Sequence, residues 1–116
     1  MKKQEPTLFE FEHMEFEKAG EKVSTRMISG REIAFSNSHF EKGCRLPMHR
    51  HENEQITYVL TGCLKGTAGE KNYTLKPGQA VLIPSFLPHE WEALEDTTTL
   101  DIFSPPREKP TFDRFA

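Results

Sequence analysis

Short apolar runs separated by proline and glycine dominate the pattern of this chain. Residues 32–40 and 48–62 show strand character, and shorter runs of the same kind cover residues 63–68, 72–75, 79–83, 89–94 and 97–104. Pro105 and Pro106 stop the last run, because neither residue can donate to a β-ladder. Strands of about five to eight residues, with no convincing helix between them, predict an all-β fold, an antiparallel sandwich or barrel.

The ends of the chain are patterned less clearly than its middle. The first twenty residues alternate acidic and aromatic side chains, which fits an edge strand, a short helix or a loose arm. We therefore expect an N-terminal arm or edge strand over residues 1–30, one barrel over 31–106 and a C-terminal tail over 107–116. A length of 116 residues suits a single domain.

Composition narrows the classes of function. The formal net charge is -3 and no basic run is present, which argues against a nucleic-acid partner. No stretch approaches the roughly 20 apolar residues that a membrane-spanning helix needs. Two lysines near the start are not followed by an apolar segment, so we expect no secretory signal and a cytoplasmic protein. Cys44 and Cys63 are then expected to be reduced thiols.

A histidine cluster is the main candidate for chemistry. His49, His51 and Gln55 share one parity, so an extended strand would point all three side chains to the same face. His89 follows Pro88 at the start of another strand, which could lie beside the first. Three imidazoles and an amide oxygen suit one divalent ion of Mn, Fe, Co, Ni or Zn. The alternative is that His49 and His51 are two solvated histidines on a strand.

Residues 43–62 resemble the first motif of the cupin family, G-x5-H-x-H-x3-E-x6-G. Gly43, His49, His51 and Gly62 stand at their motif positions, and Gln55 stands where Glu is usual. A neutral amide leaves the ion's charge uncompensated by any protein ligand. The ion should therefore be a stronger Lewis acid that is held less tightly and attracts an anionic substrate oxygen. If the strand bulges, Glu54 is a rival ligand.

Residues 78–93 are similar to the second cupin motif, G-x5-P-x-G-x2-H-x3-N. Phe86 replaces a Gly, and it either packs in the core or narrows the pocket. Ala93 replaces an Asn, which removes one partner for His89. The two motifs together imply a single-domain cupin, a double-stranded β-helix or jelly-roll barrel. Its metal ligands would be His49, His51, Gln55 and His89.

The run D-x-F-S-P-P-R at residues 101–107 looks like that of the pectin-degradation (KdgF-type) cupins, which also use Gln at the fourth ligand position. That resemblance implies opening of the ring of a 4,5-unsaturated uronate, a small acidic substrate, to a linear keto-uronate. It also implies active-site positions at Asp101, Phe103 and Arg107. A buried carboxyl near a cation can move a proton, a guanidinium can hold a carboxylate, and Phe103 would shape the pocket wall.

Other functions stay open at this point. Taken singly, Asp101, Phe103 and Arg107 also fit a strand-end polar residue, a core residue and a solvated charge. An Fe- or Ni-dependent dioxygenase acting on a small organic acid is a second enzyme class. A non-catalytic module that binds or senses a sugar is a third reading, and metal analysis followed by an unsaturated-uronate assay separates the three.

The last strand also carries apolar side chains of the other parity. Asp101 and Phe103 share the face of the histidines, so Leu100 and Ile102 should point outward. A strand that is apolar on both faces needs cover on both. The cover would be the Phe-rich N-terminal arm or a second subunit, and we expect a homodimer.

Overall fold

The computed structural model describes residues 4–107 and is built almost wholly of β-strands. After a short 3-10 helix, η1 (Phe11–His13), the strands are β1 (Glu17–Gly20), β2 (Val23–Ser29), β3 (Ala34–Phe40), β4 (Arg45–His49), β5 (Glu54–Thr61), β6 (Leu64–Ala68), β7 (Lys71–Leu75), β8 (Ala80–Ile83), β9 (His89–Ala93) and β10 (Thr97–Ser104). Within this part of the chain, no helix is long and apolar enough to cross a bilayer.

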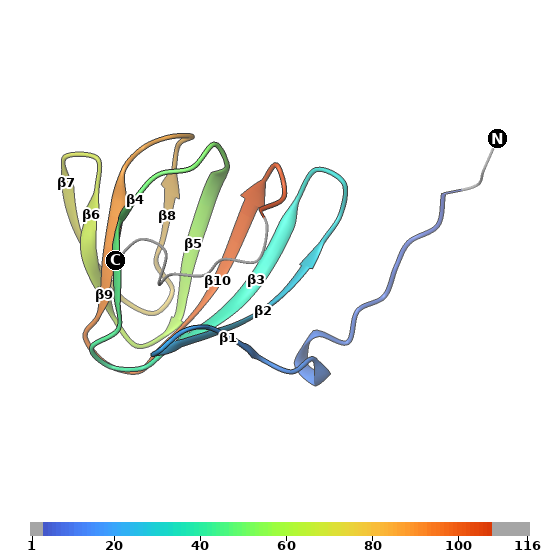
Figure 1. Cartoon of the computed structure of the whole chain (residues 1–116), viewed down its shortest axis with the longest axis horizontal. Helices are drawn as coiled ribbons and strands as arrows, with labels where there is room; N and C mark the ends of the chain where they lie inside the picture. Colours follow the sequence, from blue (N-terminus) through green and yellow to red (C-terminus); the bar gives the residue numbers. More distant parts are fainter. Residues whose placement is uncertain (1–3, 108–116) are drawn as a thin grey trace.

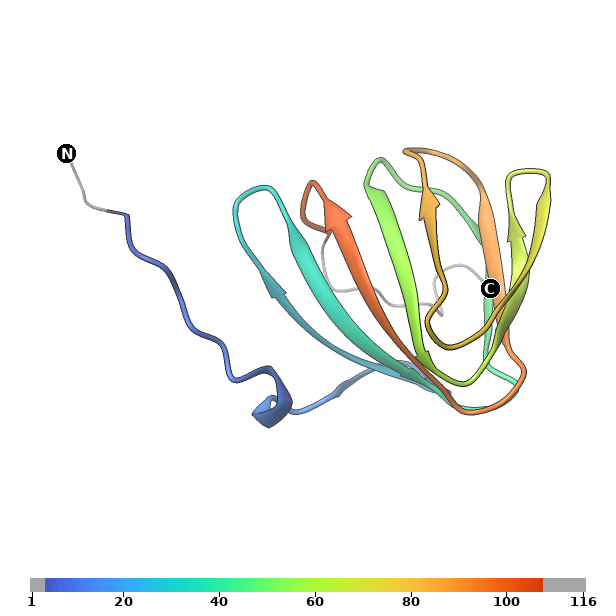
Figure 2. The same ribbon diagram turned by 180° about the vertical axis from the view of Figure 1, so that it is seen from behind.

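The strands form two antiparallel sheets that face each other (Figure 1). One sheet has six strands in the order β1-β2-β3-β10-β5-β8, and the other has four in the order β4-β9-β6-β7. The view from behind shows the same two sheets and the loops that join their strands (Figure 2). The all-β fold expected from the strand pattern is confirmed, and so is the jelly roll that the resemblance to the cupin motifs implied.

The run over residues 48–62 is divided between the two sheets. β4 ends at His49 in the four-stranded sheet, and β5 begins at Glu54 in the six-stranded sheet. His51 therefore lies in the connection rather than on one extended strand with Gln55, as the parity argument had assumed. Sequence parity alone could not show that the chain changes sheets here.

The N-terminal region adds to one edge of the larger sheet. β2 pairs with β3 from Val23 opposite Phe40 to Ser29 opposite Ala34, and β1 pairs with β2. Before η1, residues 4–10 run away from the barrel as an extended arm (Figure 1). Of the tail expected over residues 107–116, only Arg107 falls within the described residues.

The space between the sheets is apolar in one part and polar in another. Burial of apolar surface, worth roughly 25 cal/mol per Å², is the main force that holds the sheets together. The apolar part includes Val59, Leu64, Ile83 and Trp91, each no more than 5% exposed. The polar part is formed by inward side chains of β4, β5, β9 and β10 and contains the site residues expected from the sequence, His49, Gln55, His89 and Asp101.

A motif glycine makes the tight connection between β5 and β6. Gly62 has a φ of 91°, in the left-handed region that favours glycine. A Cβ at this position would overlap the backbone of Asp96 and Thr97. The first motif therefore ends in glycine because β10 passes directly against the turn.

Candidate metal centre

Three histidines meet in the polar part of the interior. His49 is the last residue of β4, His89 is the first of β9, and the two are partners in the antiparallel register. The ring centroids lie 4.2 Å apart for His49 and His89, 5.1 Å for His51 and His89, and 5.7 Å for His49 and His51. One nitrogen from each ring lies within 4.8 Å of the other two. The structure brings together the three histidines that the motifs singled out.

The three rings are oriented in the same way. Each Nδ1 lies at hydrogen-bond distance from a backbone carbonyl two residues away, at 2.8 Å for His49, 3.0 Å for His51 and 2.8 Å for His89. A carbonyl only accepts, so each Nδ1 carries the hydrogen of the neutral ring and each Nε2 keeps its lone pair. His89 Nε2 is buried and has no hydrogen-bond partner among the described residues. This is the arrangement in which imidazoles coordinate a metal.

The surroundings keep these rings neutral at physiological pH. The pKa of His49 is lowered to about 4, chiefly by burial, with smaller contributions from the neighbouring His89 and Arg107. Burial also lowers the pKa of His51 to about 4, with the positive charge of Arg107 as the next cause. The pKa of His89 is lowered chiefly by burial. Neutral rings are the form that binds a cation, so no proton has to be displaced.

Gln55 faces the histidines with its amide oxygen. Its Oε1 lies 3.0 Å from His51 Nε2, while its Nε2 donates to Thr57 Oγ1 at 2.8 Å and to Asp101 Oδ1 at 3.3 Å. The amide orientation follows from these partners, because a carboxylate accepts hydrogen bonds and cannot donate them. Two lone pairs, from a neutral His51 and from Gln55, therefore point at each other. A cation between them resolves this contact, so the residues present fit a bound divalent ion.

Asp101 lies behind Gln55 in a network of hydroxyl groups. Thr57 Oγ1 donates to its Oδ1 at 2.6 Å, and Thr99 Oγ1 donates to its Oδ2 at 2.8 Å. Burial raises the pKa of Asp101, and the hydrogen bonds from Thr57, Thr99 and Gln55 oppose that rise. A buried carboxyl with a raised pKa is closer to the range in which it can exchange a proton at neutral pH.

Arg107 and Phe103 close the other side of the cluster. Phe103 is 3% exposed, and its ring centroid lies 6.2 Å from that of His51 in an edge-on contact. The Arg107 guanidinium carbon lies 5.7 Å from the Phe103 ring centroid. Burial lowers the pKa of Arg107, and the charge of Asp101 opposes that change. The structure thus places Asp101, Phe103 and Arg107 around the same cluster as Gln55 and the histidines.

The cavity at this cluster is small. It holds about 30 Å³ and is lined by His49, Gln55, His89, Asp101, Phe103 and Arg107 among others. That volume is about what one molecule occupies in liquid water. The cavity therefore accommodates an ion or a water molecule but not a sugar ring. A larger ligand therefore requires lining side chains to move, and Arg107 is the one of them that is not fully buried.

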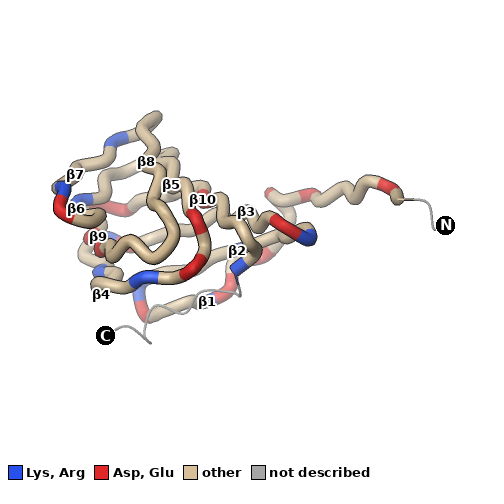
Figure 3. The backbone as a smooth tube through the Cα atoms, turned by 90° about the horizontal axis from the view of Figure 1, so that it is seen from above, with Lys and Arg blue, Asp and Glu red and all other residues tan. Residues whose placement is uncertain are grey.

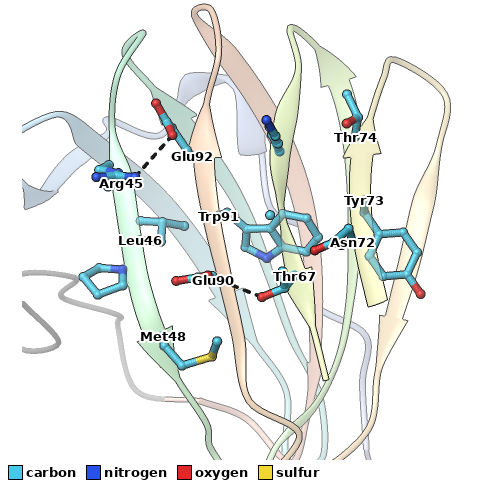
Figure 4. A pocket seen from close by; sticks show the side chains of 13 residues that line it. Arg45, Leu46, Met48, Thr67, Asn72, Tyr73, Thr74, Glu90, Trp91 and Glu92 are labelled. Atoms are coloured by element: carbon cyan, nitrogen blue, oxygen red, sulfur yellow. Dashed lines mark hydrogen bonds and ion pairs between the residues drawn. The ribbon is translucent and has the colours of Figure 1, made fainter. Parts of the chain in front are cut away.

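A larger pocket lies away from the histidines, over the four-stranded sheet (Figure 4). It holds about 650 Å³, and its lining includes ion-paired Arg45 and Glu92, with 3.6 Å between Nη2 and Oε1. Thr67 and Glu90 also line it, and no histidine does. The larger pocket therefore contains none of the candidate ligands His49, His51, Gln55 and His89 in its lining.

The structure corrects or completes three expectations from the sequence, those for Phe86, Ala93 and Glu54. Phe86 neither packs in the core nor narrows the cavity: it is 59% exposed, and its φ is 64°. Its backbone N–H donates to the His51 carbonyl at 2.8 Å, which ties the second motif to the first. His89 Nδ1 has the Leu87 carbonyl as its hydrogen-bond partner, so it needs no Asn at position 93. Glu54 is exposed and is not a rival ligand.

Sequence reasoning missed two residues of the site. Thr99 shares the parity of Asp101 on β10, and this signal could have shown it to be a partner. Asn53 carried no such signal: it is buried, its carbonyl accepts from His51, and its Nδ2 donates to the Pro105 carbonyl at 2.6 Å. Asn53 thus links the connection between β4 and β5, which carries His51, to the segment that carries Arg107.

Comparisons with known proteins identify the class. The family model of the cupin domain matches residues 37–104, more than half of the chain. The chain therefore belongs to the cupin family, and its histidine cluster is one that could hold a metal ion. Among curated protein sequences, none matches the chain.

Solved structures share the fold across nearly the whole chain. The structure of KdgF from Halomonas sp. matches with a TM-score of 0.84 at 24% identity, covering 90% of this chain and 97% of that one. An RmlC-like cupin from Shewanella frigidimarina matches with a TM-score of 0.81 at 26% identity, covering 93% and 97%. Oxalate decarboxylase from Bacillus subtilis, described with Mn(II) centres, matches with a TM-score of 0.76 at 19% identity, covering 90% of this chain and 32% of that one.

Proposed function

We propose that this cupin is a metal-dependent enzyme that opens the ring of an unsaturated uronate. His49, His51 and His89 would hold one divalent ion of Mn, Fe, Co, Ni or Zn through Nε2, and Gln55 would hold it through Oε1. The observation that carries the proposal is the pairing of Gln55 with Asp101 at 3.3 Å, which puts a buried carboxyl directly behind a neutral ligand. When bound, the ion supplies Lewis acidity toward the oxygen atoms of the sugar.

Of the remaining residues, Asp101 would transfer a proton and Arg107 would bind the carboxylate of the substrate. Ring opening to a keto-uronate is an isomerisation in which one proton leaves an oxygen and one arrives at a carbon. A single carboxyl that both accepts and donates can serve both steps, and the raised pKa of Asp101 suits that role. Arg107, with its half-buried cationic side chain, would pair with the uronate carboxylate in a bidentate manner. Phe103 would form the wall against the sugar.

Two further observations support this proposal. The Asp-Ile-Phe-Ser-Pro-Pro-Arg run at residues 101–107 resembles that of the pectin-degradation cupins, which also carry Gln at the fourth ligand position. The likeness in fold to KdgF extends over 90% of the chain. The small volume of the cavity means that substrate entry is accompanied by displacement of the Arg107 side chain from the lining.

An unsaturated uronate provides a direct assay, because the conjugated C=C bond absorbs ultraviolet light and is lost on ring opening. Protein loaded with each metal in turn should remove this absorbance. Asp101→Asn should lower turnover by about 10²–10⁴-fold, the usual contribution of a general acid–base group. Arg107→Ala should chiefly raise KM. Glu92→Gln, on the outer face of the four-stranded sheet, is the matched control and should behave as wild type.

The proposal fails if no metal supports turnover, or if Asp101→Asn turns over as fast as wild type.

The volume of about 30 Å³ favours one second candidate, oxidation of a small organic acid by a metal-dependent dioxygenase. Oxygen consumption with small acids, in protein inactive toward uronates, would establish that alternative.

A further inference from the structure

Two buried side-chain nitrogens lack a hydrogen-bond partner among the described residues, and both belong to β9. They are His89 Nε2 and Trp91 Nε1. The two residues lie two positions apart on one strand, so their side chains share the inner face of the sheet. Both also line the small cavity at the histidine cluster. Unpaired buried polar atoms are rare in native proteins, and two of them at one cavity indicate a ligand.

The two nitrogens need opposite kinds of partner. His89 Nε2 offers a lone pair, which a divalent cation satisfies. Trp91 Nε1 carries a hydrogen and can only donate, so its partner has to be an acceptor and cannot be a cation. A cavity of about 30 Å³ has room for one oxygen atom of a ligand or for one water molecule. A metal ion therefore accounts for His89 and leaves the Trp91 donor unexplained.

The Trp91 ring is held in place by the neighbouring strands. β9 lies between β4 and β6 (Figure 3), and the register partners of Trp91 are Leu46 on one side and Gly66 on the other. A Cβ at Gly66 would lie 2.8 Å from Trp91 Cε3, so glycine at this position makes room for the ring. Tyr73 on β7 packs against it, with ring centroids 6.4 Å apart. A ring packed in this way cannot turn its Nε1 toward another partner.

The nitrogen lies on the edge of the ring that faces the site. Figure 4 shows it on the side of Glu90, toward the end of β9 that begins with His89. The other polar groups that line the cavity already have partners or a charge of their own. Asp101 accepts from the hydroxyl groups of Thr57 and Thr99, and Arg107 is a cation. Trp91 is thus a fixed, neutral donor that is available to a ligand.

We propose, on the basis of the uronate-opening function above, that the Trp91 N–H donates a hydrogen bond to an oxygen atom of the sugar. One oxygen of the substrate fits the small cavity, and the rest of the molecule occupies the space that the Arg107 side chain vacates. Trp91 would then be a substrate-binding residue in addition to Asp101, Phe103 and Arg107.

The chemistry of ring opening gives this donor a reason to act. The anomeric hydroxyl gives its proton to Asp101 and becomes a carbonyl, while the bond between the anomeric carbon and the ring oxygen breaks. The ring oxygen keeps the electron pair as an enolate until Asp101 returns the proton to carbon. A hydrogen bond strengthens as its acceptor becomes negative, so an N–H on a sugar oxygen favours the transition state.

Trp91 is the one tryptophan of the chain, so its indole N–H gives a single signal in a proton–nitrogen correlation spectrum. The probe is the unsaturated uronate itself, added to zinc-loaded Asp101→Asn protein, which keeps the four metal ligands and should turn over slowly. The uronate should shift the indole signal downfield, because a hydrogen bond to oxygen deshields the proton. Without the uronate, the signal should stay where it is.

Two replacements remove the N–H in different ways. Trp91→Phe keeps an aromatic ring, and growth of a tryptophan auxotroph on 3-benzothienylalanine replaces the N–H by sulfur at this one position with the ring size retained. Each should lower kcat/KM for the uronate by about tenfold to a hundredfold, the range for loss of one hydrogen bond to oxygen. Metal affinity should not change. Tyr58→Phe removes a donor from the outer face of β5 and is the matched control.

An indole signal that the uronate leaves unmoved would overturn the proposal, and a buried water molecule would then be the partner of Nε1. Wild-type kcat/KM in the benzothienyl protein would also overturn it, and so would loss of metal binding in both replacements, which marks a structural role. Absence of turnover in the wild type removes the proposed activity instead. Even then, the indole shift on addition of the uronate decides whether Trp91 contacts the sugar.

Discussion

At the residue scale, Gln55 stands where the first cupin motif usually has a glutamate, and Asp101 lies directly behind it. The amide oxygen of Gln55 faces the histidines, and its nitrogen donates to the Asp101 carboxylate. The carboxylate of this pair therefore lies one layer behind Gln55, in a network of threonine hydroxyls. A glutamate at position 55 would instead place two carboxylates at the 3.3 Å separation now bridged by an N–H.

Gln55→Glu should therefore destabilise the metal-free protein. The expected loss is about 1–3 kcal/mol, the usual penalty for leaving a buried polar group without a partner. Adding Asp101→Asn to this variant restores a donor to face the new carboxylate and should recover most of the loss. Thermal unfolding of the two variants in chelator, followed by circular dichroism, measures this. Equal melting temperatures for Gln55→Glu and wild type would contradict the account.

At the element scale, much of the fold could be predicted from the sequence. The strand over residues 97–104 is β10 with the same bounds, and the hairpin around Gly69 is β6 and β7. The side chains of β10 alternate as expected, with Asp101 inside and Ile102 outside. These features are local, because strand periodicity and turn residues depend on near neighbours along the chain.

The parts that could not be predicted depend on contacts distant in sequence. The change of sheet between His49 and Glu54 is such a part, because strand parity does not show which sheet a strand joins. The roles of Asn53 and the Leu87 carbonyl also belong here, since each depends on a backbone position set by the fold. Strand parity alone left His49 and His51 open between a metal site and two solvated histidines, and the spacing of the two motifs favoured the metal site because it matches a known family.

The loop between β8 and β9 contains a strained residue. Phe86 occupies a motif position where glycine is usual, with φ at 64° and its side chain exposed. A non-glycine residue in this region costs roughly 1–2 kcal/mol. Phe86→Gly should therefore stabilise the protein by up to about 1 kcal/mol, after the entropy that glycine gains in the unfolded chain.

Chemical denaturation compares Phe86→Gly with Phe86→Ala. The alanine variant removes the same ring and keeps the strain, so it should not be stabilised. Metal binding should be unchanged in both, because Phe86 contacts the site only through its backbone N–H to His51. Equal stabilities of the glycine and alanine variants would show that the backbone at position 86 is unstrained.

At the scale of the whole molecule, the buried histidines link stability to pH. In the folded, metal-free protein the pKa values of His49 and His51 are about 4, below the ordinary value of 6.5. Between these values the unfolded chain binds protons that the folded chain does not. The contribution of these two histidines to the free energy of unfolding is therefore fully present above about pH 6.5 and is lost as the pH falls toward 4. The raised pKa of Asp101 opposes this trend.

The melting temperature of the metal-free protein should therefore fall between pH 6.5 and pH 4. Replacing His49 and His51 by glutamine should make the curve shallower in that window, because two of the three histidines with a lowered pKa are then absent and only His89 remains. An unaltered slope in the double variant would mean that these histidines are not buried in the neutral form.

The most direct test of the central claim is a metal titration. By isothermal calorimetry and elemental analysis, wild type should bind one divalent ion per chain from the set Mn, Fe, Co, Ni and Zn. His89→Ala removes the buried Nε2 that has no hydrogen-bond partner among the described residues and should weaken binding at least a hundredfold. His39→Ala, on β3, should bind as wild type. Binding of none of these ions, or equal binding by His89→Ala, would contradict a metal centre at this cluster.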